Sequence, residues 1–442
     1  MHRLRLKRRP RAAFLLLAFA LFGLACITTA AADEITQYFP VTVSGEPPAK
    51  RESGWRITWH VYPPARKKVA THLYGGSSVW EIRSIDFMKG YRPDGSEDWV
   101  RVLNRLAMAE MYVPYHDGKT EFFDITQFEF PMIRARRDFL PRSGITSAKL
   151  HEDGYIISEV TDDHVRWMDN NDRNKVQRGQ VLNLWGTLFS GNYRYILRYS
   201  FSDDGTISVR VGGTAENFFD FYDEAHGGKQ DLATHIHMAA WRMEFNLGNP
   251  DNVILEMIER DTDKTGKPAT RVRPFNGGRE GGEIWDPTKF SVLRVSSGQT
   301  KNRADPPRNI TYTLRAVRTG SVRTRRAFTS RDFWVSRLQP DSRTRTDRGP
   351  EFRFIDVPDN VSVNPEPING KAVAIWHQTG LNHIVRSEDY GVTGRKEYGA
   401  AIAAWTGFDL VPSNLWHQTP FLQRQEEAPR DPRPPHGPQH GR

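Results

Sequence analysis

The sequence predicts a mainly β fold, a large antiparallel β-sandwich, on the basis of three observations. Apolar and polar residues alternate in many short runs, which is the pattern of half-buried strands. Long helical periodicity is hard to find. The chain contains 12 Trp, 14 Tyr and 24 Phe residues, and aromatic side chains of this kind fill extensive buried cores. The expected strands are 55–61, 79–87, 108–113, 193–201, 207–211, 235–245 and 373–376.

The connections between these strands carry turn and loop signals. Asp203-Asp204-Gly205 separates two of the expected strands, so 193–201 and 207–211 should form a hairpin. The segments 260–274 and 339–350 are rich in Arg, Asp, Gly and Pro and are expected to be loops.

The first 32 residues have the composition of a secretory signal peptide. A basic start precedes an apolar stretch over 12–25, and Ala30-Ala31-Ala32 offers a small-residue cleavage site before Asp33. We therefore expect a periplasmic or secreted protein. Arg8-Arg9 leaves open whether export follows the twin-arginine or the general secretory route. A lipoprotein based on Cys26 is the less favoured alternative, because Gly23 stands where a leucine is expected.

The remaining chain divides by composition into three parts. Residues 33–54 are short and polar and are expected to form an arm or linker, 55–423 should form the sandwich domain, and 424–442 are expected to be disordered. The apolar stretch in the signal is shorter than a bilayer span and no second one follows, so no membrane insertion is expected.

Cysteine usage and charge exclude several classes of function. Cys26 is the only cysteine, so the mature chain should have no disulfide, thiolate metal ligand or nucleophilic thiol. Six of the Arg and Lys residues and no acidic residue lie in 1–32, so the formal charge of +9 becomes +3 without that segment. Binding to nucleic acid therefore has no electrostatic support, and no nucleic-acid partner is expected.

A pair of histidines in an expected strand suggests a metal site. Successive side chains of a strand face opposite ways, so His235 and His237 should point in the same direction and could chelate one metal ion through neutral imidazoles. His383, far downstream, would supply a third imidazole. Such a ligand set suits copper(II), zinc or nickel better than calcium or magnesium, but it does not choose among them. A single histidine on a strand is more often a hydrogen-bonded core or surface group.

Seven short segments extend this signal along most of the chain. In this order and at this spacing they resemble the copper amine oxidase family from about residue 55 to 423. The segments are Val113-Pro114-Tyr115-His116-Asp117, Gly191-Asn192-Tyr193-Arg194-Tyr195-Ile196, Asp204-Gly205-Thr206-Ile207, His235-Ile236-His237, Phe333-Trp334-Val335-Ser336-Arg337, Gly380-Leu381-Asn382-His383-Ile384 and Leu410-Val411-Pro412-Ser413-Asn414-Leu415-Trp416.

The resemblance implies a fold and an activity. The fold is the family's catalytic β-sandwich, a supersandwich. The activity is copper-dependent oxidation of a primary amine by dioxygen to an aldehyde, ammonia and hydrogen peroxide. By position, His235, His237 and His383 are the implied copper(II) ligands, and Tyr193, which follows Asn192, is the implied precursor of the topaquinone cofactor. Without the resemblance, Tyr193 would be read as an ordinary core tyrosine.

Further catalytic residues follow from the same resemblance. Tyr115 is expected to hydrogen-bond the quinone, and Asp124 to remove the α-proton of the bound amine, for which a carboxylate with a raised pKa would suit. Phe122 would be the substrate gate and makes aromatic amines the favoured substrates. Asp124 could instead be a turn carboxylate after a strand, in which case Asp117 would be the base.

The sequence also departs from the family pattern. Arg194 follows the quinone position, and its side chain should face away from Tyr193. The acidic segment of the family's calcium site is replaced by Glu244-Phe245-Asn246, and a later aspartate by Ala372, so calcium is not predicted.

His377, six residues before His383, is not expected to be a ligand, and the other histidines are expected at the surface. The chain is short for the family, whose members are homodimers, so a homodimer is expected.

Two alternatives of other classes stay open at this point. The chain could be a non-catalytic copper-binding protein on the same fold, if Arg194 and the short interval between Tyr115 and Asp124 prevent quinone formation. It could also be a periplasmic glycan-binding β-sandwich, since its aromatic-rich strands could stack on sugars.

Overall fold

The protein is described by a computed structural model. The residues whose structure it describes are 33–39, 53–61, 80–115, 118–127, 130–141, 147–151, 153–168, 176–190, 193–215, 235–317, 322–338, 357–358, 361, 364–383 and 403–416.

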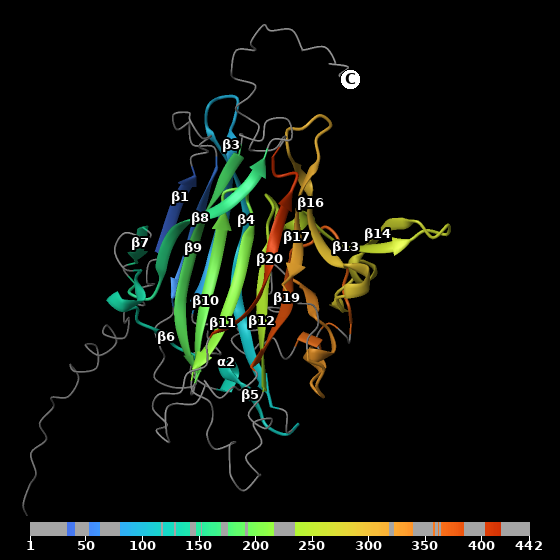
Figure 1. Cartoon of the computed structure of the whole chain (residues 1–442). Coiled ribbons are helices and arrows are strands. Elements are labelled where there is room, and N and C mark those ends of the chain that lie inside the picture. Colours follow the sequence, from blue (N-terminus) through green and yellow to red (C-terminus); the bar gives the residue numbers. More distant parts are fainter. Residues whose placement is uncertain are drawn as a thin grey trace, which may run out of the picture. The chain divides into compact units, whose positions relative to one another are not determined.

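Within these residues, two antiparallel sheets make up nearly all of the regular structure (Figure 1). Sheet A has nine strands, with β5 paired to β4 outside the main path. In spatial order they are β1 (Asp33–Phe39), β2 (Ser53–Val61), β3 (Trp80–Tyr91), β4 (Glu97–Pro114), β12 (His235–Phe245), β19 (Val373–His383), β18 (Phe333–Arg337) and β15 (Gly281–Glu283), with β5 (Glu121–Phe123).

Sheet B has eleven strands, with β6 paired to β9 outside the main path. In spatial order they are β14 (Pro268–Pro274), β13 (Val253–Thr262), β16 (Val292–Lys301), β17 (Asn309–Ala316), β20 (Ala404–Ser413), β11 (Ile207–Ala215), β10 (Tyr193–Ser202), β9 (Val176–Ser190), β8 (Ile157–Met168) and β7 (Ser147–Leu150), with β6 (Met132–Ile133).

Helices are short in the described part of the chain. The α-helix α2 (Asp124–Gln127) follows β5 directly, and it lies at the same end of the strands as β5 in Figure 1. Single 3₁₀ turns are η1 (Arg137–Phe139), η5 (Pro250–Asn252), η6 (Phe275–Gly278), η7 (Pro287–Lys289) and η8 (Ala327–Ser330). No helix formed by the described residues is long and apolar enough to cross a membrane.

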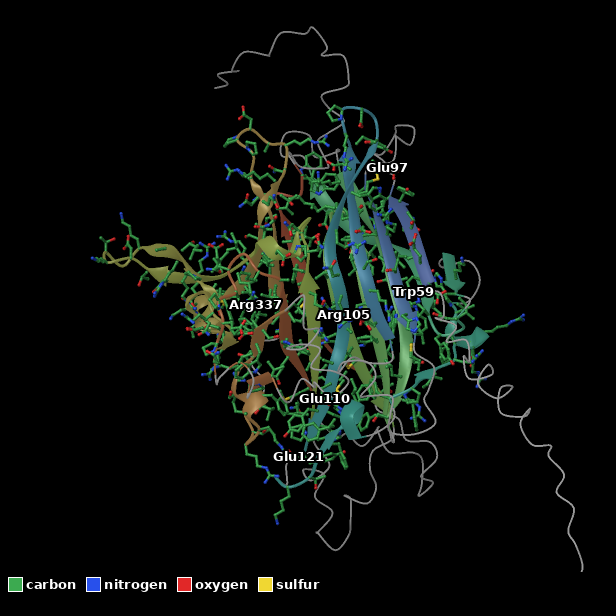
Figure 2. All side chains as sticks on the ribbon, turned by 180° about the vertical axis from the view of Figure 1, so that it is seen from behind. Trp59, Glu97, Arg105, Glu110, Glu121 and Arg337 are labelled. Carbon is green, nitrogen blue, oxygen red and sulfur yellow. The ribbon has the colours of Figure 1, made fainter. Side chains whose placement is uncertain are left out.

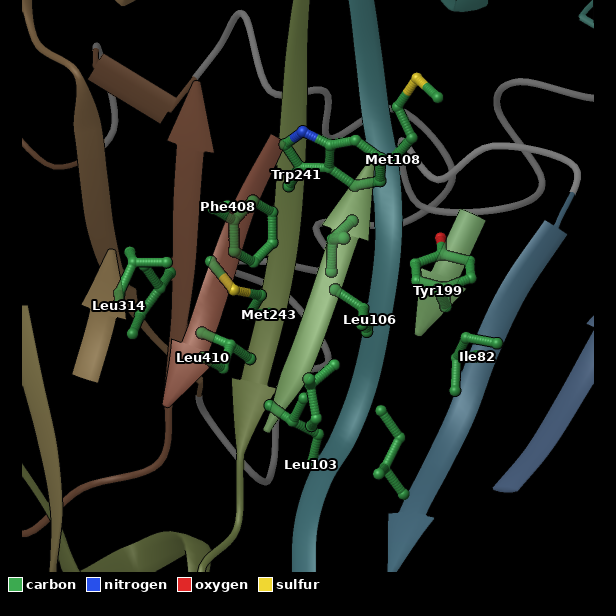
Figure 3. Close-up of a cluster of buried hydrophobic side chains, with 14 of the residues drawn as sticks. Ile82, Leu103, Leu106, Met108, Tyr199, Trp241, Met243, Leu314, Phe408 and Leu410 are labelled. Atoms are coloured by element: carbon green, nitrogen blue, oxygen red, sulfur yellow. The ribbon is translucent and has the colours of Figure 1, made fainter. Parts of the chain in front are cut away.

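The core lies between the two sheets and is built by strand alternation. Along β10 the residues Tyr193, Tyr195 and Leu197 are buried while Arg194 is exposed, as the period of two in a strand requires. Trp241 of sheet A packs against Tyr199 and Phe408 of sheet B at ring-centroid distances of 6.4 and 5.8 Å. Figure 3 shows this cluster filling the space between the sheets.

Sheet A is also covered on its outer face. A second buried cluster includes Tyr112, Trp334 and Trp376, which project from β4, β18 and β19. The central strands of sheet A are therefore buried on both faces, and 9 of the 11 residues of β12 and 9 of the 11 residues of β19 are buried.

The predicted sandwich is confirmed, and each of the seven expected strands lies within or overlaps an observed strand. The expected hairpin is confirmed too. Strands β10 and β11 pair in antiparallel register, and Gly205 adopts a φ of +94° in the turn between them, which suits glycine.

Two expectations about connecting segments were wrong. Residues 260–274, expected to be a loop, contain the end of β13 and all of β14, which pair with each other from Glu256↔Pro274 to Thr262↔Pro268. Their charged side chains are those of an exposed two-stranded extension, not of a loop.

Among the described residues, regular structure begins at Asp33, inside the segment expected to be an arm or linker, because 33–39 pair with β2 along their full length. That segment is therefore an edge strand of sheet A. The segments 1–32, 339–350 and 424–442 lie outside the described residues.

Candidate metal and catalytic site

The candidate site lies at the end of the sandwich where several strands of both sheets begin or end. Strand β12 begins at His235, the antiparallel strand β19 ends at His383, and β10 of the opposite sheet begins at Tyr193. β-Strand geometry therefore brings together residues that lie up to 190 positions apart in the sequence.

The three predicted histidines form one cluster. His235 and His383 are register partners on neighbouring strands, and His237 lies two residues along on the same face. Each offers a ring nitrogen, and these atoms all lie within 4.8 Å of one another. The three side chains are buried, with exposures of 2, 0 and 7% for His235, His237 and His383.

Tyr193 reaches this cluster from the facing sheet. Its hydroxyl lies 2.6 Å from His235 Nε2 and 2.6 Å from His383 Nδ1. Tyr193 and the histidines therefore lie on strands of opposite sheets that face each other. The phenol oxygen therefore lies within hydrogen-bond distance of two of the three imidazoles that could hold a metal ion.

His237 fits the role of the third ligand. Its Nδ1 lies 2.8 Å from the Tyr195 hydroxyl, whereas its buried Nε2 has no hydrogen-bond partner among the described residues. Burial, followed by the charges of His235 and His383, lowers the pKa of His237 well below its usual value, so its imidazole is neutral. A neutral buried imidazole with one unsatisfied nitrogen is what a metal ligand requires.

Asp124 lies next to this cluster, at the first residue of α2. Its Oδ2 accepts a hydrogen bond of 2.9 Å from the Tyr195 hydroxyl. Burial raises the pKa of Asp124 to about 7, although hydrogen bonds from Tyr195 and Ser190 oppose the shift. A carboxyl group with this pKa can both take up and release a proton near neutral pH, as a general base must.

The two aromatic residues assigned to the site from the sequence lie at its edge. Tyr115 forms a β-bridge with His235 and stacks on its ring with centroids 4.5 Å apart. Phe122 is half-buried and packs edge-to-face on Tyr115 at 5.7 Å. Asn192 and Asp117 lie outside the described residues.

Arg194 faces away from the site, as expected from strand alternation. It is exposed, its guanidinium lies over Phe189 at 4.1 Å, and its Nη1 donates to the carbonyl oxygen of Tyr193. Its charge therefore lies on the outer face of sheet B, not beside the Tyr193 ring.

The other predicted positions have structural roles. His377 lies outside the three-histidine cluster, and its Nε2 accepts a hydrogen bond of 3.1 Å from Trp285 Nε1. Glu244, at the position of the family's calcium segment, forms ion pairs with Arg242 and Arg105. His151, expected at the surface, is 8% exposed and packs on Trp59, so that expectation was wrong.

Sequence reasoning assigned no role to Tyr195, which links Asp124 to His237. A signal was present, because Tyr195 lies two residues after Tyr193 and a strand therefore turns both side chains to the same face. Ser190, which hydrogen-bonds Asp124, had no such signal, since it comes from the neighbouring strand β9.

Comparison with known proteins identifies relatives of this chain. The family model described as copper amine oxidase, enzyme domain, matches residues 150–429. This segment contains Tyr193 and the three histidines but not Asp124. Primary amine oxidase of Klebsiella aerogenes is 23% identical over 260 residues, which are 50% of this chain and 34% of that protein. Histamine oxidase of Arthrobacter globiformis is 23% identical over 379 residues, which are 74% of this chain and 52% of that protein.

Solved structures show the same fold. A copper-containing benzylamine oxidase from Hansenula polymorpha matches with a TM-score of 0.59 at 14% identity, over 84% of this chain and 61% of that one. Pichia pastoris lysyl oxidase matches with a TM-score of 0.56 at 12% identity, over 85% of this chain and 53% of that one. The chain thus spans about half or less of the length of the two amine oxidases that it matches in sequence.

The family match covers well over half of the chain, and the buried three-histidine cluster fits a copper site. This chain therefore belongs to the copper amine oxidase family.

Proposed function

We propose that this protein is a primary-amine oxidase that uses copper(II) and a topaquinone made from its own Tyr193. In the overall reaction, a primary amine, dioxygen and water give an aldehyde, ammonia and hydrogen peroxide. The amine is oxidised by two electrons, and dioxygen is reduced to the peroxide. The observation that carries the proposal is the position of the Tyr193 hydroxyl, 2.6 Å from ring nitrogens of both His235 and His383.

Each residue of the site would have a separate role in binding or proton transfer. His235, His237 and His383 would hold the metal through neutral imidazoles. When bound, copper and the quinone would supply the redox chemistry. Asp124 would take the α-proton of the bound amine at its carboxylate, for which a pKa of about 7 suits neutral conditions. Tyr115 would orient the ring of the modified Tyr193, and Asn192 stays a predicted member of the site.

Substrate selection is proposed to depend on Phe122. Its half-buried ring packs against Tyr115 at the edge of the site, and an aromatic ring at this place favours amines that carry an aromatic group. Phe122→Ala should raise KM for benzylamine more than KM for a short alkylamine. Equal effects on both amines would exclude the gate.

The assignment of Tyr193 can be tested with protein produced without copper. Copper(II) is added under air, the visible spectrum is recorded, and phenylhydrazine is added to trap a quinone. We expect a copper-dependent band that shifts with the hydrazine and is absent from Tyr193→Phe.

The matched control is Tyr199→Phe, a buried tyrosine on the same face of the same strand, which should keep the band. If Tyr193→Phe retained full amine oxidase activity, the cofactor assignment would be wrong. Stoichiometric copper binding without the band in the unmodified protein would favour a non-catalytic copper protein.

Export and assembly are proposed as well. Residues 1–32 would be removed as a signal peptide, which would place the mature protein in the periplasm or outside the cell. N-terminal sequencing of the exported protein should then begin near Asp33. We also propose a homodimer, which sedimentation equilibrium would distinguish from a monomer.

A further inference from the structure

The segment that carries Asp124 is attached to sheet A by a buried carboxylate. Glu110 lies on β4 and is 1% exposed. Its Oε1 accepts two backbone hydrogen bonds, one of 3.0 Å from the N–H of Met111 and one of 2.9 Å from the N–H of Ile125. Ile125 follows Asp124 directly in α2. Figure 2 shows Glu110 toward the end of β4 from which β5 and α2 follow.

Strand register explains why a side chain is needed at this point. Strands β4 and β5 pair with Tyr112 opposite Phe123, and continuing this register would place Ile125 opposite Glu110. The chain instead turns into α2 at Asp124, so the strand ladder ends. The Ile125 N–H then needs another acceptor, because buried backbone donors are costly to leave unpaired. The carboxylate of Glu110 takes the place that the β4 backbone would have filled.

A β-bulge lies directly before Glu110. Between β4 and β12, Glu110 pairs with Ala240 while Met108 pairs with Trp241, which leaves Ala109 as an extra residue in β4. Bulges of this kind change the direction of the side chains that follow them. The bulge and the buried carboxylate thus belong to one local arrangement at the start of α2.

Burial of a carboxylate is costly unless it accepts strong hydrogen bonds. The hydrogen bond from the Ile125 N–H to Glu110 fixes the peptide unit between Asp124 and Ile125, while the hydroxyl of Tyr195 holds the Asp124 side chain. The backbone of Asp124 and its carboxylate are therefore held by different residues. A displacement of about 1 Å at a reacting group can reduce a rate about 100-fold.

We propose that Glu110 is a positioning residue that fixes the backbone at Asp124 and so places this carboxylate for proton transfer. The part of this inference that concerns proton transfer rests on the proposed function. The part that concerns backbone position does not, because it follows from contacts between residues of the chain itself.

The positional part is tested by hydrogen exchange in the full, copper-free protein. Peptides spanning 121–127 should exchange about 10-fold faster in Glu110→Ala, because the hydrogen bond to the Ile125 N–H is lost. Glu110→Gln, which keeps an oxygen acceptor, should restore most of the protection. Unchanged exchange of this segment in Glu110→Ala would overturn the inference, whatever the activity.

The chain offers a matched control. Glu280 is also 1% exposed, and its carboxylate also accepts two backbone hydrogen bonds, from Arg337 and Glu366. Glu280→Ala therefore removes the same kind of interaction from another part of the molecule. It should leave exchange of 121–127 unchanged, and an equal increase in that segment would mean that Glu110→Ala acts only through general destabilisation.

The catalytic part is tested with copper-loaded enzyme and a double-mutant cycle. Glu110→Ala should lower kcat about 10- to 100-fold with little change in KM, and copper content and the yield of the quinone band should stay the same. In an Asp124→Asn background the same substitution should have no further effect, because Glu110 acts through Asp124. A loss of similar size in both backgrounds would contradict this part.

The two failures can be told apart. Absence of amine oxidation in the unmodified protein would refute the proposed function, while faster exchange in Glu110→Ala would still support the backbone role of Glu110. Amine oxidation with unchanged exchange would leave the proposed function in place and refute the inference.

Discussion

At the scale of single residues, the site is defined by differences in environment between chemically similar groups. His235, His237 and His383 converge within 4.8 Å, whereas His377, on the same face of β19 as His383, pairs with Trp285. Burial alone lowers the pKa of His377 to about 3. His237 and His377 are both buried with lowered pKa values, and only the convergence of several ring nitrogens distinguishes a metal site from a core histidine.

Asp124 gives a prediction about pH at this scale. Its pKa is raised to about 7 by burial, against about 3.9 in an unfolded chain. The folded state therefore favours the protonated carboxyl, and the stability linked to it is full below about pH 3.9 and is lost as the pH rises through about 7. Asp124→Asn removes the titrating carboxyl, and with it the loss of stability as the pH rises. The comparison uses copper-free protein. From pH 5 to pH 8, the unfolding free energy of Asp124→Asn should rise relative to that of the unmodified chain by about 2–3 kcal/mol.

Urea unfolding at the two pH values measures this difference. The control is Asp162→Asn, at a position where the pKa shift has the opposite direction. The carboxyl of Asp162 is exposed and ion-paired with Arg178. Its folded pKa is lowered, mainly by the hydrogen bond from Arg178, so it should show no gain between the two pH values. An effect of Asp124→Asn that does not depend on pH would contradict the raised pKa.

At the scale of elements, the strand ends position the site and close packing between strands fixes their register. Strands β11 and β20 pair with Arg210 opposite Gly407. A Cβ atom at Gly407 would lie 1.9 Å from the backbone oxygen of Val209. Glycine is therefore required here, because backbone atoms cannot move aside as a flexible side chain can.

Gly407→Ala should consequently lower the unfolding free energy by about 2–3 kcal/mol, within the range of overpacked cores. Thermal or urea unfolding measures the loss. Gly380→Ala is the control, since its Cβ would meet no atom closer than 3.9 Å and should cost less than about 1 kcal/mol. Equal stability of the two variants would show that β11 and β20 can separate at little cost.

At the scale of the whole molecule, the two sheets hold opposite halves of the site. The histidines come from sheet A and Tyr193 from sheet B, so the packing between the sheets sets the distance from the phenol to the imidazoles. Trp241 lies in this packing with 0% exposure, and its Nε1 donates to Thr379 Oγ1.

Trp241→Ala should lower the unfolding free energy by about 3–5 kcal/mol, because it leaves a large cavity between the sheets. Copper stoichiometry below the unfolding temperature should stay the same, since Trp241 is four residues from the nearest histidine along β12. Denaturant unfolding and metal analysis measure the two quantities. The control is the partly exposed Trp405→Ala, at 37% exposure, and a loss as large as that of Trp241→Ala would contradict the assignment of the core.

Much of the fold and part of the site were predictable, because they depend on local pattern or on ordered motifs. Alternation along 193–201 predicted a strand, and the His235-Ile236-His237 spacing predicted two imidazoles on one face. Segment 260–274 was assigned wrongly, because the charges of an exposed hairpin resemble those of a loop.

The sequence by itself determined the sandwich, the metal-type histidines and the resemblance to an amine oxidase, because strand periodicity and motif order are properties of a linear chain. Only the tertiary structure decided that Tyr193 meets the histidines from the opposite sheet, that Tyr195 joins Asp124 to His237, and that Glu110 supports the backbone after Asp124. These contacts depend on how two sheets face each other and on where a strand ladder stops. Distance and burial of this kind arise only when segments remote in sequence pack together, and burial is what raises the pKa of Asp124 to about 7.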